Sequence, residues 1–322
     1  MNAKADKLLL FVASVLPVEV NEDLSTQFSV TFSSVPDPVA AMCALGLPYD
    51  ALLVSVDVRL DADAIFRLPR TVGAIATYSS GLDHIDLQAV RERGLAVFNT
   101  PDVLGDAVAE IAMLLLLGAA RRATEAIELI RSRKWTGWTA TQLNGVQLTG
   151  KTLGIFGMGK IGQKIAHRAR AFGMRIAYSN RHPLPNDLAA DASFYPEFSS
   201  MLRDIDALIL AAPATPQTRG ILSAKSLGAA KRGLIVVNVA RGDLVVDEDL
   251  LGALEQGIVG AAGLDVFCGE PSVNPRYFRL PNVFMLPHMG SSTNEARRQM
   301  GLALRTALID WHQGKAPANR VV

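Results

Sequence analysis

The stretch Leu153-Gly-Ile-Phe-Gly-Met-Gly-Lys-Ile-Gly162 decides how this chain folds. Its apolar start predicts a short strand, the pattern G-x-G-x-x-G predicts a tight turn, and apolar side chains at helical spacing follow, at Ile165, Ala166, Ala169 and Phe172. In such a unit the first glycine permits the turn, the second lets the main chain approach a pyrophosphate, and the third lets the helix pack on the strand. The stretch therefore predicts a nucleotide-binding βαβ unit, with a purely structural glycine turn as the alternative.

The end of the second strand of this unit bears on the choice of cofactor. Residues 175–179 predict that strand, and it runs into Asn180 and Arg181, where a unit that binds NAD usually carries an acidic residue for the ribose. An amide does not repel a 2′-phosphate, and a guanidinium can pair with it. The sequence therefore favours NADP, with NAD as the weaker alternative, although a solvated turn before Pro183 would explain the same residues.

The composition is that of an ordinary globular protein. The 322 residues are enough for two domains, 49% of them are hydrophobic, 20% are charged, and the formal net charge is +1. This charge balance gives no reason to expect a nucleic acid or an acidic membrane as partner. Cys43 and Cys268 are too few for a disulfide framework and suit a reducing compartment. We therefore expect a cytoplasmic protein.

Two apolar runs could be mistaken for targeting or membrane segments. The first, over residues 8–15, follows a lysine pair, but Pro17 and acidic residues come directly after it, so a buried strand is the better interpretation. The second, from Ile111 to Ala120, is too short to span a bilayer. Neither run changes the expectation of a protein without a membrane partner.

Strand-like apolar runs alternate with helical or loop spacers along most of the chain, which is typical of a parallel α/β layer. The runs before the glycine pattern are Leu8–Ala13, Ala51–Val56, Val72–Thr77 and Leu95–Asn99. The runs after it, beyond residues 175–179, are Ala207–Ala211, Leu234–Val239, Ala262–Leu264 and Val283–Leu286. The predicted fold is α/β, with a flavodoxin-like and a dinucleotide-binding domain, both Rossmann-like, and a cleft between them.

The domain boundaries follow from a break and from a final helix. Pro101 interrupts the strand pattern and predicts a hinge, and residues 104–120 and 123–134 then predict two helices. A long helix predicted over Thr293–Gly314 has no later domain to join, so we expect it to return to the first one. Residues 1–100 and 289–322 are therefore expected to form a discontinuous substrate-binding domain, and residues 101–288 the NAD(P)-binding domain.

Polar residues that could do chemistry follow four of the later strand-like runs. In open parallel sheets the ligand lies beyond the carboxyl ends of the strands, so these residues are expected at one sheet edge. They are Thr215 and Thr218, then Arg241, then Asp265 and Glu270, and finally His288.

Three later motifs, taken with the glycine pattern, resemble one known family. They are Asn238-Val-Ala-Arg241-Gly-Asp, Gly263-Leu-Asp-Val-Phe-Cys-Gly-Glu270-Pro and Leu286-Pro-His288-Met-Gly-Ser-Ser-Thr293. The chain is similar to the D-isomer-specific 2-hydroxyacid dehydrogenases, most nearly to their glyoxylate and hydroxypyruvate reductase branch. The similarity extends from Ser80-Gly-Leu-Asp-His-Ile-Asp86 to Thr293, and four ordered motifs are far more specific than one.

The resemblance implies that Arg241, Glu270 and His288 are the catalytic residues, and the chemistry agrees with these residue types. Reducing a ketone builds negative charge on its oxygen, and histidine titrates near the pH at which a proton must be supplied. A carboxylate fixes the imidazole tautomer, and a guanidinium binds the carboxylate of a 2-keto acid with two parallel hydrogen bonds. Alone, each residue has a structural alternative, such as an ion pair for Arg241, and His84 is interpreted as structural.

The resemblance also implies ligand contacts and an assembly. The cofactor contacts are Gly157, Met158, Gly159, Lys160, Ile161, Gly162, Asn180, Arg181, Pro213, Thr218, Val239, Asp265 and Gly290. The substrate contacts are Ser80, Gly81 and Leu82, together with Arg241 and His288, and no metal is implied. Members of the family are usually homodimers joined through the nucleotide-binding domain, here by residues 104–138, where Trp135 and Trp138 favour a subunit contact.

The expected activity is NADPH-dependent reduction of small 2-keto acids, namely glyoxylate to glycolate and hydroxypyruvate to D-glycerate. One alternative is a larger 2-keto acid such as 2-ketogluconate. An alternative of another class is a dinucleotide-sensing binding protein, like the transcriptional corepressors that share this fold. Binding of cofactor without turnover of any 2-keto acid would favour that second alternative.

Overall fold

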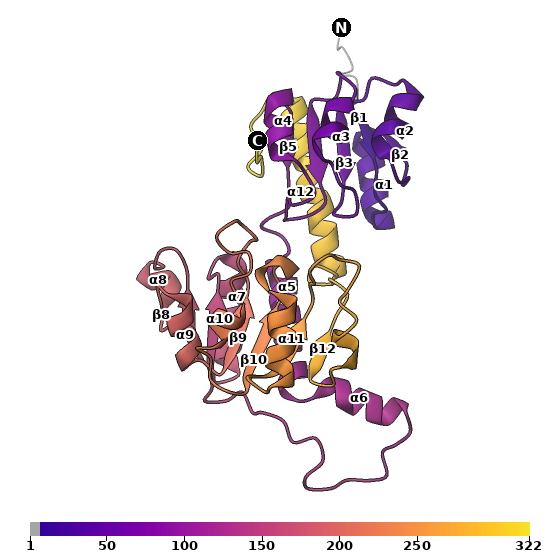
Figure 1. The fold of residues 1–322 in the computed structure, drawn as a ribbon. Coiled ribbons are helices and arrows are strands. Elements are labelled where there is room, and N and C mark those ends of the chain that lie inside the picture. Colours follow the sequence, from indigo (N-terminus) through magenta and orange to yellow (C-terminus); the bar gives the residue numbers. More distant parts are fainter. Residues whose placement is uncertain (1–6) are drawn as a thin grey trace. The chain divides into compact units, whose positions relative to one another are not determined.

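The computed structural model describes residues 7–322, so the first six residues of the predicted N-terminal domain lie outside the described residues. The chain divides into two compact units (Figure 1). The first unit runs to Leu104 and takes up the chain again from Ser291 to Val322, and the second spans Gly105–Gly290. Each unit is built around one parallel sheet, which confirms the predicted fold class.

The sheet of the first unit has the strand order β2-β1-β3-β4-β5, all parallel. Its strands are β1 (Leu9–Val12), β2 (Ser29–Phe32), β3 (Ala51–Val54), β4 (Ala74–Thr77) and β5 (Ala96–Phe98). Its helices are α1 (Val18–Gln27), α2 (Pro38–Leu45), α3 (Ala62–Arg67), α4 (Leu87–Arg93) and α12 (Asn294–His312). The C-terminal tail pairs with β5, because Val321 donates to the carbonyl of Val97 at 2.8 Å, and this covers an otherwise open sheet edge.

The sheet of the second unit has the order β12-β11-β10-β9-β6-β7-β8, again all parallel. Its strands are β6 (Thr152–Phe156), β7 (Arg175–Ser179), β8 (Ser193–Phe194), β9 (Ala207–Leu210), β10 (Leu234–Asn238), β11 (Val259–Leu264) and β12 (Val283–Met285). Strand β6 lies between β7 and β9, so the strand order reverses there, and a dinucleotide fold places its ligand at this switch point.

The helices of the second unit include the glycine-pattern helix and the predicted pair after the hinge. They are α5 (Gly105–Ala120), α6 (Ala123–Arg131), α7 (Lys160–Ala171), α8 (Asn186–Ala189), α9 (Phe198–Asp204), α10 (Ala224–Leu227) and α11 (Asp247–Glu255), with 3-10 turns η1 (Gly242–Leu244) and η2 (Tyr277–Arg279). Helix α5 packs tightly on β11, since a Cβ on Gly263 would lie 2.7 Å from the carbonyl oxygen of Leu115. This close contact explains why α5 is so apolar.

Helix α6 and the segment after it differ from the rest of the unit. No residue of α6 is buried, and residues 132–147 form neither helix nor strand. Trp135 and Trp138 lie on this segment with 53% and 81% of their surface exposed. Among residues 7–322, no helix combines the length and the apolar character that crossing a bilayer requires.

The structure corrects three details of the sequence prediction. Strands β2 and β8 were not predicted, because both are short edge strands with half-exposed, mixed side chains rather than apolar runs. Phe172 does not continue the buried face of α7. The helix ends one residue earlier, the chain turns at Gly173 with φ +72°, and the Phe172 side chain is 41% exposed.

Candidate active site

In the glycine turn after β6, main-chain segments approach one another closely. A Cβ on Gly157 would lie 2.5 Å from the amide nitrogen of Ala212, and one on Gly162 would lie 2.4 Å from the carbonyl oxygen of Gly157. Gly157 also has φ +99°, a conformation that residues with a side chain rarely adopt. Both glycines are therefore required by the fold of the turn itself.

Gly159 is different, because a Cβ there would meet no atom within 4 Å. It is the N-cap of α7 and carries no side chain that could occupy the first-turn N–H groups of the helix. Lys160 and Ile161 form that first turn, where the helix dipole and the N–H groups favour an anion. This open approach to a helix N-terminus suits the pyrophosphate of a dinucleotide.

Asn180 is hydrogen-bonded to the glycine turn. Its Oδ1 atom accepts the N–H of Met158 at 2.7 Å. The predicted main-chain contact at Met158 is therefore used inside the protein, and the buried Met158 side chain is 1% exposed. Because an N–H group can only donate, the bonded atom is the amide oxygen, which leaves the NH2 group of Asn180 for a ligand. The following residue, Arg181, is exposed.

The loop after β9 holds its own shape by hydrogen bonds. The hydroxyl of Thr218 donates to the carbonyl of Pro213 at 2.7 Å and accepts the N–H of Thr215 at 2.8 Å. Thr218 therefore shapes the turn, and Pro213 is one of its exposed residues. Val239 follows β10 directly and is half-buried.

His288 and Glu270 are joined by a side-chain hydrogen bond. The Nδ1 atom of His288 lies 2.7 Å from Oε2 of Glu270, and the other carboxylate oxygen accepts the N–H of Phe267 at 2.7 Å. Burial raises the pKa of Glu270, but the hydrogen bonds from His288 and Phe267, aided by the charge of Arg241, outweigh this and leave the pKa below its ordinary value. Since Nδ1 is committed to Glu270, Nε2 of His288 is the nitrogen available to exchange a proton with a ligand.

Arg241 stands at the end of β10 on a loop that is fixed at both ends. Its Nη1 atom donates to the carbonyl of Ala240 at 2.6 Å, and Asn238 donates from its side chain to the Arg241 carbonyl at 2.8 Å. A Cβ on Gly242 would lie 1.9 Å from the carbonyl carbon of Phe267, so the Arg241 loop rests directly on the loop that carries Glu270. The role of Gly242 was not predicted from the sequence, where its place directly after Arg241 is the one available signal.

Asp265 is hydrogen-bonded to the main chain of His288 and Met289. It is 1% exposed, its Oδ1 atom accepts the N–H of Met289 at 2.8 Å, and its main-chain carbonyl accepts the N–H of His288 at 2.8 Å. His288 itself has φ +51°, in the left-handed region that few residues with side chains occupy. Burial raises the pKa of Asp265, while hydrogen bonds from the main chain of Met289 and Gly290 oppose that rise.

The predicted substrate loop belongs to the first unit and follows β4. The carbonyl groups of Ser79, Ser80 and Gly81 all accept hydrogen bonds: Thr100 N–H donates to Ser79, the Asn99 side chain to Ser80, and the Ser79 hydroxyl to Gly81. Within the described part of the chain, no hydrogen bond uses the N–H groups of Ser80 or Gly81. A loop with occupied carbonyls and unused N–H groups suits an anion, and Leu82 beside it is half-buried. His84 bonds to Thr77 at 2.8 Å, in keeping with a structural role.

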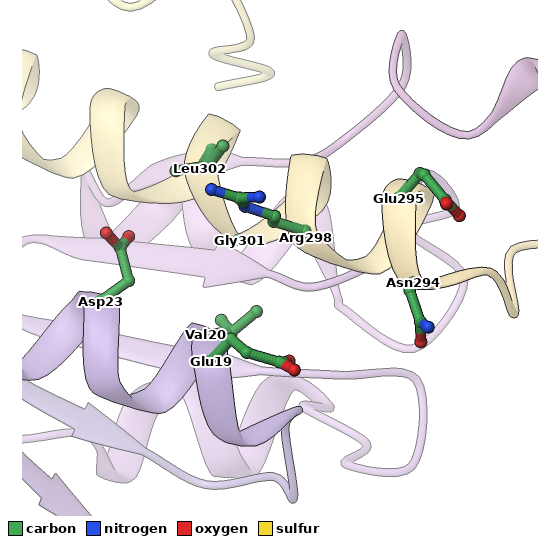
Figure 2. Close-up of a pocket in the computed structure, with 8 residues that line it drawn as sticks. All are labelled: Glu19, Val20, Asp23, Asn294, Glu295, Arg298, Gly301 and Leu302. Carbon is green, nitrogen blue, oxygen red and sulfur yellow. The ribbon is translucent and has the colours of Figure 1, made fainter.

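The first unit also contains a cavity of about 530 Å³ between α1 and α12, shown in Figure 2. Three carboxylates line it, from Glu19, Asp23 and Glu295, against the single guanidinium of Arg298. This excess of negative charge does not suit an anionic acid. In residues 7–322, no group of three or more His, Cys, Asp or Glu side chains is arranged to hold a metal ion.

Comparison with known proteins agrees with this geometry. Residues 113–290 match the family model described as D-isomer specific 2-hydroxyacid dehydrogenase, NAD binding domain. The chain is 45% identical over 253 residues to a glycerate dehydrogenase of Hyphomicrobium methylovorum, covering 78% of this chain and 79% of the relative. It is 40% identical over 276 residues to a glyoxylate reductase of Thermococcus litoralis, covering 84% and 83%.

A solved structure extends the likeness to almost the whole chain. It is an NADPH-dependent glyoxylate/hydroxypyruvate reductase from Sinorhizobium meliloti, determined in complex with NADP and malonate. The two chains share 30% sequence identity with a TM-score of 0.89, covering 98% of this chain and 97% of that one.

Proposed function

The chain belongs to the family of D-isomer-specific 2-hydroxyacid dehydrogenases, and from this premise we propose that it reduces glyoxylate to glycolate and hydroxypyruvate to D-glycerate with NADPH. The observation that carries the proposal is the His288–Glu270 pair beside Arg241, on three loops that follow the neighbouring strands β10, β11 and β12. A proton donor and a carboxylate-binding cation on adjacent loops are what reduction of a 2-keto acid requires.

His288 is the proposed general acid. With NADPH held by the second unit, the chemistry supplied to the site would be transfer of a hydride to the carbonyl carbon. As negative charge builds on the carbonyl oxygen, Nε2 of His288 donates a proton to it, while Nδ1 keeps its hydrogen bond to Glu270. The Glu270 carboxylate accepts the hydrogen bond from Nδ1 and so leaves Nε2 as the ring nitrogen that meets the substrate.

Arg241 is proposed to bind the substrate carboxylate. Its planar guanidinium can make two parallel hydrogen bonds to that group and so orient the adjacent carbonyl. In the first unit, the Ser80 and Gly81 N–H groups are proposed as substrate contacts, with Leu82 beside them. The occupied carbonyls of that loop support this assignment.

NADPH is the proposed cofactor because of the residues that follow β7. The NH2 group of Asn180 and the guanidinium of Arg181 offer donors to a 2′-phosphate, where an acidic residue would repel it. Lys160 and Ile161 at the start of α7 are assigned to the pyrophosphate. Pro213 and Thr218 are assigned to the ribose side, with Val239 and Gly290 toward the nicotinamide, and NAD is the weaker alternative.

We also propose a cytoplasmic homodimer joined through the second unit. The two cysteines are both free, as suits a reducing compartment. The exposed apolar side chains of Ile127, Ile130, Trp135 and Trp138 gather on α6 and the segment after it. Aromatic and aliphatic side chains left exposed in this number favour a protein contact.

The test is a panel of initial rates for oxidation of NADPH and of NADH by the purified protein. Glyoxylate, hydroxypyruvate, pyruvate and 2-ketogluconate are the substrates. The proposal predicts the fastest turnover with NADPH and the two small acids. A preference for 2-ketogluconate would reassign the substrate, a preference for NADH would overturn the cofactor assignment, and no turnover with any acid would favour a cofactor-binding protein without catalysis.

A further inference from the structure

We propose that Asn319, on the segment that follows α12, is a positioning residue for the predicted substrate loop and acts on that loop through Asn99. The proposal rests on the proposed function in one respect, the assignment of the Ser80 and Gly81 N–H groups as substrate contacts. It makes a residue 220 positions beyond Asn99 in the sequence part of the support for those contacts.

Residues 317–322 extend the sheet of the first unit at its β5 edge. They pair with β5 through an antiparallel bridge, and in Figure 1 this part of the chain, drawn in yellow at the label C, lies beside β5. Pro317 is buried, and Val322 packs against the hydrophobic core of the first unit. The segment is therefore held on both sides of Asn319.

Asn319 is bonded to Asn99 through its side chain and through its main chain. Its Nδ2 atom donates to the Asn99 carbonyl at 2.7 Å, and its own carbonyl accepts the Asn99 N–H at 3.4 Å. Asn99 directly follows β5, and only 7% of its surface is exposed. Water has little access to these groups, so removing the Asn319 side chain would deprive the Asn99 carbonyl of the partner that the fold gives it.

Asn99 and its neighbour Thr100 are in turn bonded to the substrate loop. The Nδ2 atom of Asn99 donates to the Ser80 carbonyl at 2.9 Å, and the Thr100 N–H donates to the Ser79 carbonyl at 2.9 Å. Two consecutive carbonyl groups of the loop are thus bound to the segment that Asn319 holds.

These two carbonyl bonds set the direction of the two N–H groups assigned to the substrate. A trans peptide unit is planar, so the carbonyl of one residue and the N–H of the next point in opposite directions. A bound Ser79 carbonyl therefore orients the Ser80 N–H, and a bound Ser80 carbonyl orients the Gly81 N–H. In the described part of the chain no hydrogen bond uses either N–H, which leaves both for a ligand.

The test compares Asn319→Ala and Asn319→Asp, an isosteric change that removes the amide donor, with Asn282→Ala as the matched control. Asn282 is also joined twice to a neighbouring strand. Its Nδ2 atom donates to the Gly260 carbonyl at 3.1 Å, and its carbonyl accepts the Ala262 N–H at 3.0 Å. It precedes β12, at the sheet edge opposite the loops of the second unit that carry the candidate catalytic residues.

Four quantities are measured for each protein. They are the melting temperature, the NMR resonances of the Ser80 and Gly81 amides without ligand, kcat and KM for glyoxylate, and the Kd of NADPH. The loop N–H groups are proposed to bind substrate and to take no part in hydride or proton transfer, so a disordered loop should raise KM and leave kcat almost unchanged.

For both Asn319 variants we expect the Ser80 and Gly81 amide resonances to shift or broaden and the KM for glyoxylate to rise about tenfold, with kcat and the NADPH Kd changed by less than about threefold. The control should lower the melting temperature without changing the resonances or the KM. In an Asn99→Ala background, Asn319→Ala should raise KM little further, because both changes break the same link.

Unchanged Ser80 and Gly81 resonances in both Asn319 variants would overturn the proposal, whatever happens to the melting temperature. Altered resonances with an unchanged KM in an active enzyme would also overturn it, because the loop would then not hold the substrate. The resonances are recorded without substrate or cofactor, so they test the positioning even if the wild-type protein reduces no 2-keto acid. Such inactivity would count against the proposed function alone.

Discussion

The Nδ1 atom of His288 lies 2.7 Å from Oε2 of Glu270, although the two residues belong to loops that follow different strands, β12 and β11. The pairing depends on main chain as much as on side chains. Phe267 N–H holds the second oxygen of Glu270, and Asp265 holds the main chain at His288. The candidate acid is therefore held through its side chain by Glu270 and through its main chain by Asp265.

The pH dependence of stability should reveal the hydrogen bonds that Glu270 accepts. The pKa of Glu270 is held below its ordinary value of 4.5, so its contribution to stability is present above pH 4.5 and is lost as the pH falls through the lowered pKa. We expect Glu270→Gln to lower the free energy of unfolding above pH 4.5, with the difference from wild type shrinking below it. Denaturant titrations over a pH series measure this. A difference that stays constant into the acid range would contradict it.

Gly242→Ala should damage catalysis without removing any catalytic group. The new Cβ would lie 1.9 Å from the carbonyl carbon of Phe267, so the Arg241 and Glu270 loops must separate. Misplacement of about 1 Å can cost about a hundredfold in kcat/KM. The control is Gly252→Ala in α11, where the nearest atom lies at 3.8 Å and the helix should gain stability. Equal activity of the two variants would count against the role of Gly242.

Alanine substitutions at two glycines of the same turn should affect different properties. The one at Gly159 should affect cofactor binding, and the one at Gly162 should affect stability. Gly159→Ala meets no protein atom within 4 Å, so stability should hold while the KM for NADPH rises about tenfold or more, because the methyl group occupies the approach of the pyrophosphate. Gly162→Ala would place a Cβ 2.4 Å from the Gly157 carbonyl and should cost about 1–3 kcal/mol of stability. Thermal unfolding and cofactor kinetics distinguish them, and an unchanged KM in Gly159→Ala would argue against a pyrophosphate there.

Asn180→Asp should move the enzyme toward NADH. An aspartate can still accept the N–H of Met158, so the turn is preserved, but its charge repels a 2′-phosphate. We expect the ratio of kcat/KM for NADPH to that for NADH to fall about ten- to a hundredfold. Asn186→Asp, at the exposed start of α8 in the same unit, is the control for an added negative charge. An unchanged ratio would mean that Asn180 does not contribute to the discrimination between NADPH and NADH.

The dimer prediction can be tested on α6. Ile130 is 57% exposed on a helix without buried residues, so Ile130→Asp should leave the subunit folded and weaken self-association by about 2 kcal/mol or more. Leu188→Asp is the matched control, because Leu188 is 47% exposed on α8 of the same unit. Sedimentation velocity over a concentration series gives the mass. A wild-type protein that is monomeric throughout would refute the proposed assembly.

The sequence was sufficient for the parts of the fold that follow a repeating rule. Buried strands such as β6 and β10 are continuous apolar runs, and the glycine turn has a fixed spacing, so both are visible without coordinates. Edge strands β2 and β8 are half-exposed and lack that signal. The end of α7 before Phe172 depends on a left-handed turn at Gly173, which periodicity alone does not locate.

The candidate site, like the fold, has features that the sequence predicts and features that it does not. The motifs around Arg241, Glu270 and His288 selected these residues through their resemblance to a known family, and their catalytic roles stay a prediction. The supporting contacts were not predictable. The contact of Gly242 with Phe267 and the bonds from Asp265 to residues 288 and 289 join segments whose separation is set by strand register and loop packing. Burial of Asp265 is likewise a property of the folded sheet and not of its neighbours in sequence.

The most direct measurement is the rate of NADPH oxidation with glyoxylate by wild type and by His288→Asn, with cofactor affinity measured in parallel. If His288 is the general acid of a keto-acid reductase, wild type turns over glyoxylate and the variant loses about a hundredfold or more in kcat at unchanged NADPH Kd. Equal rates in the two proteins would contradict the assignment of His288, and absence of turnover in wild type would contradict the proposed reaction.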